Sequence, residues 1–331
     1  MTENMDIIKC FSGAGKVLFA LKSGKDMSKL ELKTRTGLSM TTVISAVDEL
    51  VERGLVSFES VKGARGGKMR SLINLRPDKR VYGISYKSGV LTAVAADLGG
   101  EARERASQEP PDGASPLGCV YALVNALKRK APPPIAIALS LNCDGKEEVL
   151  RGLAERYGVP TLSLTNTEGS AYLALWQGAP MPIAALGVGA RVKCAFVDYA
   201  GRRVAEVGAL PSPALITGEG SYASALSSSA VEETLRTSRY HGKYCIERGR
   251  ITEVRDLADY SAALALTLSS LVKAVEHFLS PSRVILFGEY LTEAFCARVQ
   301  EVVGKVVYTR PEKEDFARGA AICALKECVF S

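Results

Sequence analysis

The chain of 331 residues is long enough for two or three domains, and its composition excludes several protein classes. Its hydrophobic and charged fractions, 47% and 24%, are those of ordinary globular proteins. No apolar run reaches the roughly 18–20 residues that cross a bilayer, and the polar start of the chain lacks the apolar core of a signal peptide. We therefore expect a cytoplasmic protein with no membrane partner. Eight cysteines without C-x-x-C spacing and two histidines predict no metal site.

The positive charge is concentrated in the first quarter of the chain. Residues 1–80 contain 15 Lys/Arg and 9 Asp/Glu, whereas residues 81–331 contain 27 of each. The net charge of +6 therefore belongs to the N-terminal segment alone. This asymmetry predicts a polyanionic partner for that segment and none for the rest.

The N-terminal segment has the pattern of a helix-turn-helix. Ser28 and Glu31 form a capping-box pattern that predicts a helix over 28–36. Gly37 can end that helix in the left-handed conformation, and Ser39 can cap a second helix over 40–53. An apolar stripe at helical spacing defines the buried face of the second helix: Val43, Ala46, Val47, Leu50 and Val51. Two helices joined by a three-residue turn with glycine are typical of a DNA-binding helix-turn-helix.

The beginning of the second helix has side chains suited to DNA. Short polar groups there can reach base edges or phosphates in the major groove, and the acidic residues come only at positions 48, 49 and 52. The helix N-terminus adds free N–H groups and partial positive charge. The predicted contacts to double-stranded DNA from this helix are Ser39, Met40, Thr41, Thr42 and Ser45.

A cationic hairpin is predicted directly after this helix. Strands over 55–59 and 71–75 enclose a tip with four cations, three glycines and no acids. Such a wing can reach a phosphate strand or the minor groove. Its predicted DNA contacts are Lys62, Arg65, Gly66, Gly67, Lys68 and Arg70. The alternative is that residues 28–76 form a protein-interaction module with a solvated loop.

The short sequence Gly13-Ala-Gly-Lys16 does not predict a phosphate-binding loop. Such a loop needs the pattern G-x-x-x-x-G-K-S/T, but Cys10 stands at its first glycine and Val17 follows the lysine. We predict the start of a helix or a loop there.

From residue 79 onward, strands alternate with helices, which predicts an α/β domain with a mixed sheet. The predicted strands are 81–86, 90–96, 102–107, 135–141, 161–164, 182–186, 192–198, 283–287 and 306–308. The predicted helices are 117–130, 149–157, 168–177, 221–226, 230–236, 257–279, 291–303 and 314–327.

Both parts of the sequence resemble the ROK family of repressors, uncharacterised reading frames and sugar kinases. The segments that carry the resemblance are 28–32, 36–43, 47–56, 66–70, 74–77, 82–89, 97–100, 158–160, 166–174, 186–189, 206–208, 284–288 and 318–321. The resemblance implies a winged helix-turn-helix over 1–78, followed by a two-lobed actin/hexokinase-like (ribonuclease H-like) domain over 79–331, with lobes of roughly 79–185 and 186–331.

The resemblance also implies that the kinase chemistry is lost. Where the family's kinases have an Asp and a Gly-rich phosphate turn, this chain has Ser85, Lys87 and Ser88. The position of the catalytic Asp after Asn166 is Thr167, whose hydroxyl cannot act as a base near neutral pH.

This chain also departs from the family's pattern at the second phosphate loop and at the zinc site. The loop keeps Gly187 and Gly189, but Val188 stands in place of the family's Thr and Arg191 stands in place of a later Gly. Ala209 replaces the zinc-binding His, and no Cys or His follows over 211–221. We therefore expect no catalytic residue, no metal and no cofactor.

These features together predict a homodimeric or higher homo-oligomeric repressor of carbohydrate-related genes. Its winged domains would bind a pseudo-palindromic operator, and its kinase-like domain would dimerise and bind a sugar or sugar-phosphate effector through Asn166, Thr167 and Glu206. Two alternatives are an active sugar kinase with a DNA-binding extension and a constitutive DNA-binding protein with no effector.

Overall fold

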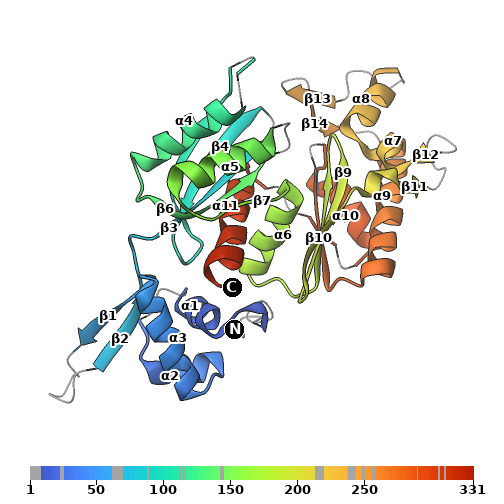
Figure 1. The fold of residues 1–331 in the computed structure, drawn as a ribbon. Helices are drawn as coiled ribbons and strands as arrows, with labels where there is room; N and C mark the ends of the chain where they lie inside the picture. The colour runs from blue at the N-terminus through green and yellow to red at the C-terminus, as the bar shows by residue number, and fades with distance from the viewer. Residues whose placement is uncertain are drawn as a thin grey trace. The chain divides into compact units, whose positions relative to one another are not determined.

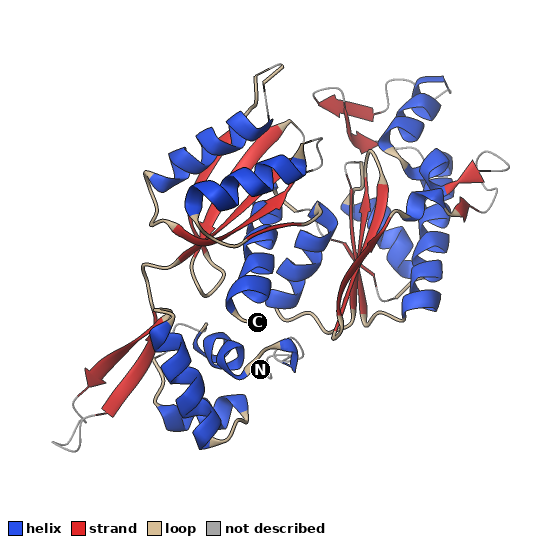
Figure 2. Ribbon diagram, in the orientation of Figure 1, coloured by secondary structure: helices blue, strands red, loops and turns tan. Residues whose placement is uncertain are grey.

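The chain forms two compact units in a computed structural model (Figures 1 and 2). Of the described residues, the first unit comprises those from 9 to Thr165 with Lys313–Ser331, and the second comprises those of Asn166–Glu312. The structure describes residues 9–22, 26–61, 70–87, 89–111, 113–114, 116–141, 145–212, 220–237, 244–247, 250–254, 258–288, 290–304, 306–308 and 311–331.

The first unit begins with a winged helix-turn-helix. Its elements are α1 (Gly13–Leu21), α2 (Lys29–Thr36), α3 (Met40–Glu52), β1 (Val56–Val61) and β2 (Arg70–Leu75). The capping box is formed, because the Ser28 hydroxyl accepts from the Glu31 N–H and the Glu31 carboxylate accepts from the Ser28 N–H. Gly37 ends α2 with φ of 71°, in the left-handed region. The predicted helix-turn-helix and its hairpin are therefore present.

One residue of the predicted apolar stripe lies outside the core. Val43, Val47 and Leu50 are fully buried, but the Val51 side chain is 40% exposed. Each residue turns the helix by about 100°, so Val51 has rotated away from the face that Val43 and Leu50 share. Its assignment to the buried stripe was wrong.

Removing the α2 cap should weaken the winged helix measurably. In Ser28→Ala the Glu31 N–H loses its side-chain acceptor, so we expect a loss of about 1 kcal/mol in the free energy of unfolding. Urea denaturation followed by hydrogen exchange of α2 amides measures this loss. The control is Thr34→Ala on the exposed face of the same helix, which should be neutral or slightly stabilising. Equal stability of Ser28→Ala and the wild type would contradict the role of the cap.

A five-stranded mixed sheet forms the rest of the first unit. It contains β3 (Arg80–Lys87), β4 (Val90–Ala96), β5 (Ala102–Gln108), β6 (Pro134–Ser140) and β7 (Thr161–Ser163), in the order β5-β4-β3-β6-β7. Side chains of α4 (Pro116–Lys128) and α5 (Lys146–Tyr157) share a core with Tyr82 and Ile84 of β3. Helix α11 (Lys313–Ala324) packs on β3 at Gly83, which lies between Tyr82 and Ile84 along the strand. Because alternate residues of a strand face opposite ways, α11 covers the other face.

The second unit repeats this sheet design. Its sheet contains β8 (Ile183–Val188), β9 (Val192–Asp198), β10 (Gly201–Ala205), β15 (Arg283–Gly288) and β16 (Val306–Tyr308), in the order β10-β9-β8-β15-β16. In both sheets the first three strands along the chain are antiparallel and the last two join in parallel. The two sheets share the same strand order and the same strand directions. This arrangement is the ribonuclease H-like fold expected from the sequence.

The remaining elements of the second unit surround its sheet. They are α6 (Asn166–Trp176), η2 (Val207–Ala209), β11 (Pro211–Ser212), β12 (Gly220–Ser221), α7 (Tyr222–Leu226), α8 (Ser228–Thr237), β13 (Tyr244–Glu247), β14 (Arg250–Val254), α9 (Ala258–Leu279) and α10 (Glu293–Val302). Strand β10 and the pairs β11–β12 and β13–β14 were not predicted. The predicted closing helix over 314–327 is instead α11 followed by one π-helical turn, η3 (Leu325–Val329).

Helix α9 has the length and apolar composition of a membrane span. Its window Ala262–Leu279 has a mean hydropathy of 1.4, and 44% of that window is buried. No such segment was expected from the sequence. The buried side of α9 includes Leu268, Leu271 and Val272, which belong to the core beside the second sheet. A core helix of a globular protein passes the same test of length and composition.

Candidate nucleic-acid interface and ligand residues

The first turns of α3 present short polar side chains to the outside. Thr41, Thr42 and Ser45 are exposed, and Met40 is half-buried. Ser39 caps the helix: its hydroxyl accepts from the Thr42 N–H at 3.1 Å and lies 2.8 Å from the Thr42 hydroxyl. The structure thus places all five predicted residues at one helix end, with Ser39 and Thr42 partly engaged in the cap. Thr41 and Ser45 are the better candidates for direct contacts.

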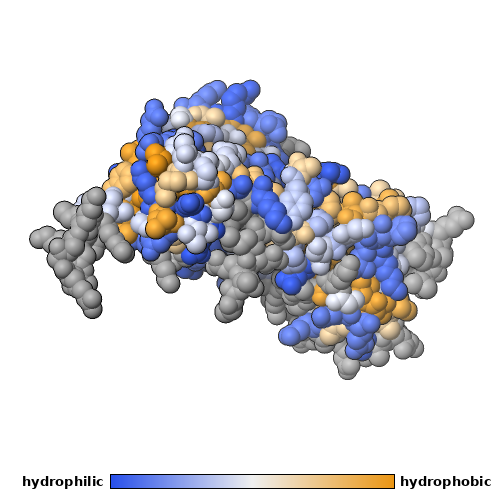
Figure 3. Space-filling model, turned by 90° about the horizontal axis from the view of Figure 1, so that it is seen from below, coloured by the Kyte–Doolittle hydropathy of each residue, from blue (hydrophilic) through white to orange (hydrophobic). Residues whose placement is uncertain are grey.

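An exposed apolar residue lies among them that the sequence analysis did not select. The Ile44 side chain is 40% exposed between Thr41 and Ser45. Its position outside the apolar stripe was the signal that could have revealed it, since an apolar residue off the stripe must face outward. Seen from below, apolar surface lies among hydrophilic residues (Figure 3). In the winged helix the exposed large apolar residues also include Leu30 and Phe58. An exposed isoleucine can contact a thymine methyl group in the major groove.

The predicted wing contacts fall mostly outside the described residues. These are Lys62, Arg65, Gly66, Gly67 and Lys68. Arg70 begins β2, and its backbone is paired with Val61 at the tip end of the hairpin. The register of β1 and β2 is continuous from Val56 opposite Leu75 to this pair. The described part of the hairpin therefore ends at this pair, and the contacts predicted for 62–69 stay a prediction.

The three predicted ligand residues have different surroundings in the second unit. Asn166 begins α6, and Thr167 is buried with its hydroxyl 3.1 Å from where a Cβ on Gly187 would lie. Glu206 is half-exposed and pairs with Arg191, with 3.5 Å between Nη1 and Oε2. Thr167 therefore lies beside β8, whereas Glu206 lies in a surface ion pair. Such an exposed pair contributes little to stability.

A buried ion pair next to Thr167 was missed by the sequence analysis. Glu168 is 6% exposed, and its carboxylate accepts from Arg202 of β10. A buried carboxylate requires a paired cation, because desolvation disfavours the lone charge. Nothing in the sequence marks this pair, because the partners are 34 positions apart.

The two glycines retained in the second phosphate loop have structural roles. A Cβ on Gly187 would lie 3.0 Å from the Phe287 ring, so this glycine permits close packing of β8 and β15. The Gly189 N–H donates to the Arg191 carbonyl at 3.2 Å, and its carbonyl accepts from Ser228 at 2.9 Å. A loop N–H that is already bonded within the loop is a poor donor for a phosphate oxygen.

The first hairpin of the kinase-like fold is also closely packed. Ser85, at the position of the kinases' Asp, is buried and donates to the Lys313 carbonyl at 3.4 Å. Strands β3 and β4 remain paired as far as Lys87 opposite Val90. The hairpin therefore closes tightly, where the kinases of the family have a glycine-rich turn.

Two cysteines of the second unit have buried, unreactive thiols. Burial raises the pKa of the Cys194 thiol to about 11 and that of Cys296 to about 12. Both thiols are therefore protonated at neutral pH, and a protonated thiol is neither a good nucleophile nor a metal ligand. Among the described residues, no group of three or more His, Cys, Asp or Glu side chains could hold a metal ion.

No protein-family model and no curated protein matches the sequence. Solved structures do match the fold. A ROK family transcriptional regulator, described as a homolog of the E. coli MLC protein, is 16% identical with a TM-score of 0.73, and 97% of each chain is covered. A ROK hexokinase from Thermus thermophilus is 16% identical with a TM-score of 0.57 and covers 73% of this chain and 97% of its own. A ROK family glucokinase from Streptomyces griseus, in complex with glucose and AMPPNP, is 14% identical with a TM-score of 0.57, covering 75% of this chain and 100% of its own.

The share of the chain that is covered differs between the regulator and the kinases. The two kinases match almost completely but leave about a quarter of this chain uncovered, whereas the regulator covers nearly all of it. The chain therefore has, over 97% of its length, the fold of a ROK family transcriptional regulator.

Proposed function

We propose that this chain is a cytoplasmic DNA-binding transcriptional repressor of carbohydrate-related genes, built from a winged helix over 1–78 and a kinase-like domain over 79–331. The observation that carries the proposal is the exposed polar first turn of α3 beside a hairpin that ends in a cationic segment. The full-length likeness to a ROK transcriptional regulator supports it. We further propose that the protein acts as a homodimer or higher homo-oligomer on a pseudo-palindromic operator.

The kinase-like domain would have lost catalysis and retained a sensory role. Thr167 offers no basic group where the family's kinases have a catalytic Asp, and the N–H of Gly189 is already bonded. These observations disfavour the alternative of an active sugar kinase with a DNA-binding extension. A sugar or sugar phosphate bound near Asn166, Thr167 and Glu206 would then act as an effector and alter DNA affinity.

Selection of bound DNA from a random pool tests the proposal directly. We expect a consensus with two-fold symmetry. In Arg65→Ala combined with Lys68→Ala, the affinity for that consensus should fall roughly tenfold or more, and the slope of log K against log salt should decrease by about two. Lys130→Ala, an exposed cation after α4, is the matched control and should bind as the wild type does. If the selection gave no consensus, or if the two wing substitutions left the DNA affinity unchanged, the protein-interaction alternative would be favoured.

Two further measurements separate the remaining alternatives. ATP turnover with a panel of hexoses should be undetectable, and brisk turnover would instead establish the kinase. A thermal shift with sugars and sugar phosphates should reveal a stabilising ligand, because a ligand that binds only the folded state raises the melting temperature. If no ligand raised it, the protein would bind DNA constitutively.

A further inference from the structure

The end of the chain is buried against the winged helix. Helix α11 continues into η3, and the last residue of η3, Val329, and the next residue, Phe330, are 3% and 0% exposed. Complete burial of the Phe330 side chain indicates that specific contacts hold this segment.

Specific contacts join this end to two elements of the winged helix. The Phe330 ring packs edge-on against Phe11, with 5.4 Å between ring centroids, and its carbonyl accepts from the Ser12 hydroxyl at 3.3 Å. The Val329 carbonyl accepts from Nη2 of Arg53 at 2.7 Å. Ser12 is the N-cap of α1, and Arg53 is the C-cap of α3. The chain end thus holds both the first helix and the predicted recognition helix.

A glycine in α1 makes this approach sterically permissible. A Cβ on Gly15 would lie 1.9 Å from the Phe330 carbonyl oxygen, a distance that no side chain can occupy. Two residues earlier in the same helix, a Cβ on Gly13 would meet only the Thr42 methyl carbon, at an ordinary 3.4 Å. The requirement for glycine is therefore specific to the seat of the chain end.

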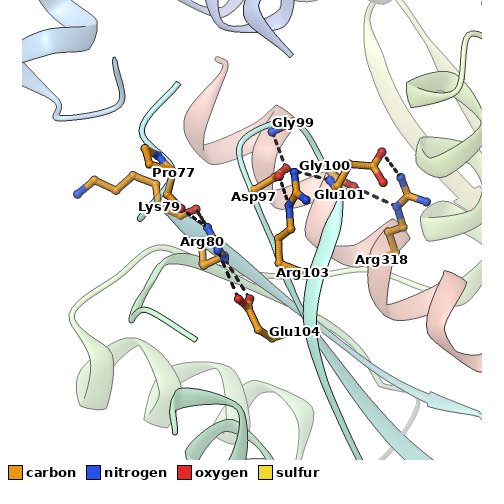
Figure 4. A network of polar contacts seen from close by, with 10 residues as sticks. All are labelled: Pro77, Lys79, Arg80, Asp97, Gly99, Gly100, Glu101, Arg103, Glu104 and Arg318. Carbon is orange, nitrogen blue, oxygen red and sulfur yellow. Dashed lines mark hydrogen bonds and ion pairs between the residues drawn. The ribbon is translucent and has the colours of Figure 1, made fainter. Parts of the chain in front are cut away.

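The middle of α11 is fixed to the sheet of the same unit. Nε of Arg318 donates to the Gly100 carbonyl at 3.0 Å, and its Nη2 pairs with Glu101 at 2.8 Å (Figure 4). These residues belong to the β4–β5 turn, which the Asp97 carboxylate orders by accepting from the Gly99 and Glu101 N–H groups. Helix α11 is thus tied to the sheet along its length.

The linker from the winged helix to β3 is tied to the same sheet. Arg80 donates to the Pro77 carbonyl and pairs with Glu104 of β5 at 3.0 Å (Figure 4). The winged helix is therefore attached both through its linker and through the chain end. Two attachments restrict its rotation, whereas the linker alone would leave it free to turn.

We propose that Phe330 and Val329 are positioning residues for DNA binding. By seating against Gly15 and Arg53, they fix α3 on α11, so the kinase-like domain sets the direction in which the recognition helix points. Chain connectivity supports a transmitting role, since α11 begins at Lys313, the first residue after the second unit ends. This inference rests on the proposed function, because it assumes an operator with two half-sites read by two copies of the chain.

The test compares a full operator with a single half-site, using the full-length protein and the selected consensus. In Phe330→Ala, affinity for one half-site should stay within about twofold of the wild type, because the recognition helix itself is unchanged. Affinity for the full operator should fall at least about tenfold, because loosely held modules lose effective concentration at the second half-site. The variant should also tolerate operators whose half-sites are moved by one base pair, which the wild type should reject.

Matched variants separate positioning from simple destabilisation. Gly15→Ala should reproduce the effect of Phe330→Ala without altering the chain end, whereas Gly13→Ala should behave as the wild type. Phe330→Leu should restore most of the spacing selectivity, since it refills the seat. Phe278→Ala removes a ring that is 79% exposed and should change nothing.

The outcomes distinguish this inference from the proposed function. Spacing selectivity that survives in both Phe330→Ala and Gly15→Ala would overturn the positioning role and leave the DNA-binding proposal intact. Absence of any DNA consensus for the wild type would overturn the proposed function, and the positioning role with it. Hydrogen exchange supplies a readout without DNA: α1 amides should exchange faster in both variants while β3 and β6 amides stay protected. Unchanged protection of α1 would overturn the seat itself.

Discussion

Gly83→Ala should lower the free energy of unfolding of the first unit by about 3 kcal/mol or more. A Cβ at this position would lie 1.9 Å from the Ala317 carbonyl oxygen and 2.4 Å from the Ala321 nitrogen, both in the backbone of α11. Backbone atoms of a packed helix cannot rotate away as a flexible side chain can, so α11 must move off β3. Urea unfolding followed by far-ultraviolet circular dichroism measures the loss.

A second glycine provides the control for this prediction. Gly118→Ala, on the exposed side of α4 with nothing within 4 Å of its Cβ, should raise stability by about 0.5–1 kcal/mol. Trp176, the single tryptophan, lies in the second unit, so its fluorescence reports that unit. In Gly83→Ala, the urea midpoint measured by tryptophan fluorescence should shift less than the midpoint measured by circular dichroism. Equal stability of Gly83→Ala and the wild type would contradict the close approach of α11 to β3.

Thr41→Glu should reduce operator affinity by roughly 100-fold, because a carboxylate would enter the groove between phosphates. Thr41 is exposed at the second position of α3. An acidic residue in the first turn interacts favourably with the helix dipole, so the helix itself should not be weakened. Loss of binding without loss of thermal stability would therefore locate the effect at the DNA. Fluorescence anisotropy with a labelled operator measures it.

The matched control places the same charge at the other end of the same helix. Val51 is exposed in the last turn of α3, and Val51→Glu should change affinity by less than about threefold, because like-charge repulsion falls off with distance in salt. Ser45→Glu, on the same exposed side as Thr41, should behave like Thr41→Glu. If Val51→Glu were as damaging as Thr41→Glu, the N-terminal half of α3 would not be the part that faces DNA.

The helix-turn-helix could be predicted nearly residue by residue. The capping pair Ser28–Glu31, the left-handed Gly37 and the N-cap Ser39 all formed as expected. These signals act over three or four residues, so the chain itself contains both partners of each interaction. The strands β3, β4, β6, β8, β9 and β15 were predicted for a similar reason, since buried strands appear as short apolar runs.

The candidate site was predictable only where its chemistry is local. The hydroxyl-bearing residues at the start of α3 and the cations between the two strands of the hairpin are each contiguous in sequence, so the sequence could propose them as contacts. The buried pair of Glu168 and Arg202 was not found, because its partners meet only through the pairing of β10 with β9. The weakly apolar strand β10, with two arginines in five residues, has no periodicity that distinguishes it from a loop.

The sequence by itself determined the winged helix, the alternation of strands and helices, and the restriction of excess positive charge to the N-terminal segment. Only the tertiary structure decided why Gly15 and Gly83 must be glycines, why Phe330 is buried, and that two sheets share one strand order. The physical reason is the range of the interactions. Caps, turns and periodicity act between near neighbours, whereas the close approach of Phe330 to Gly15 joins residues from the two ends of the chain and exists only once α11 has packed on the sheet.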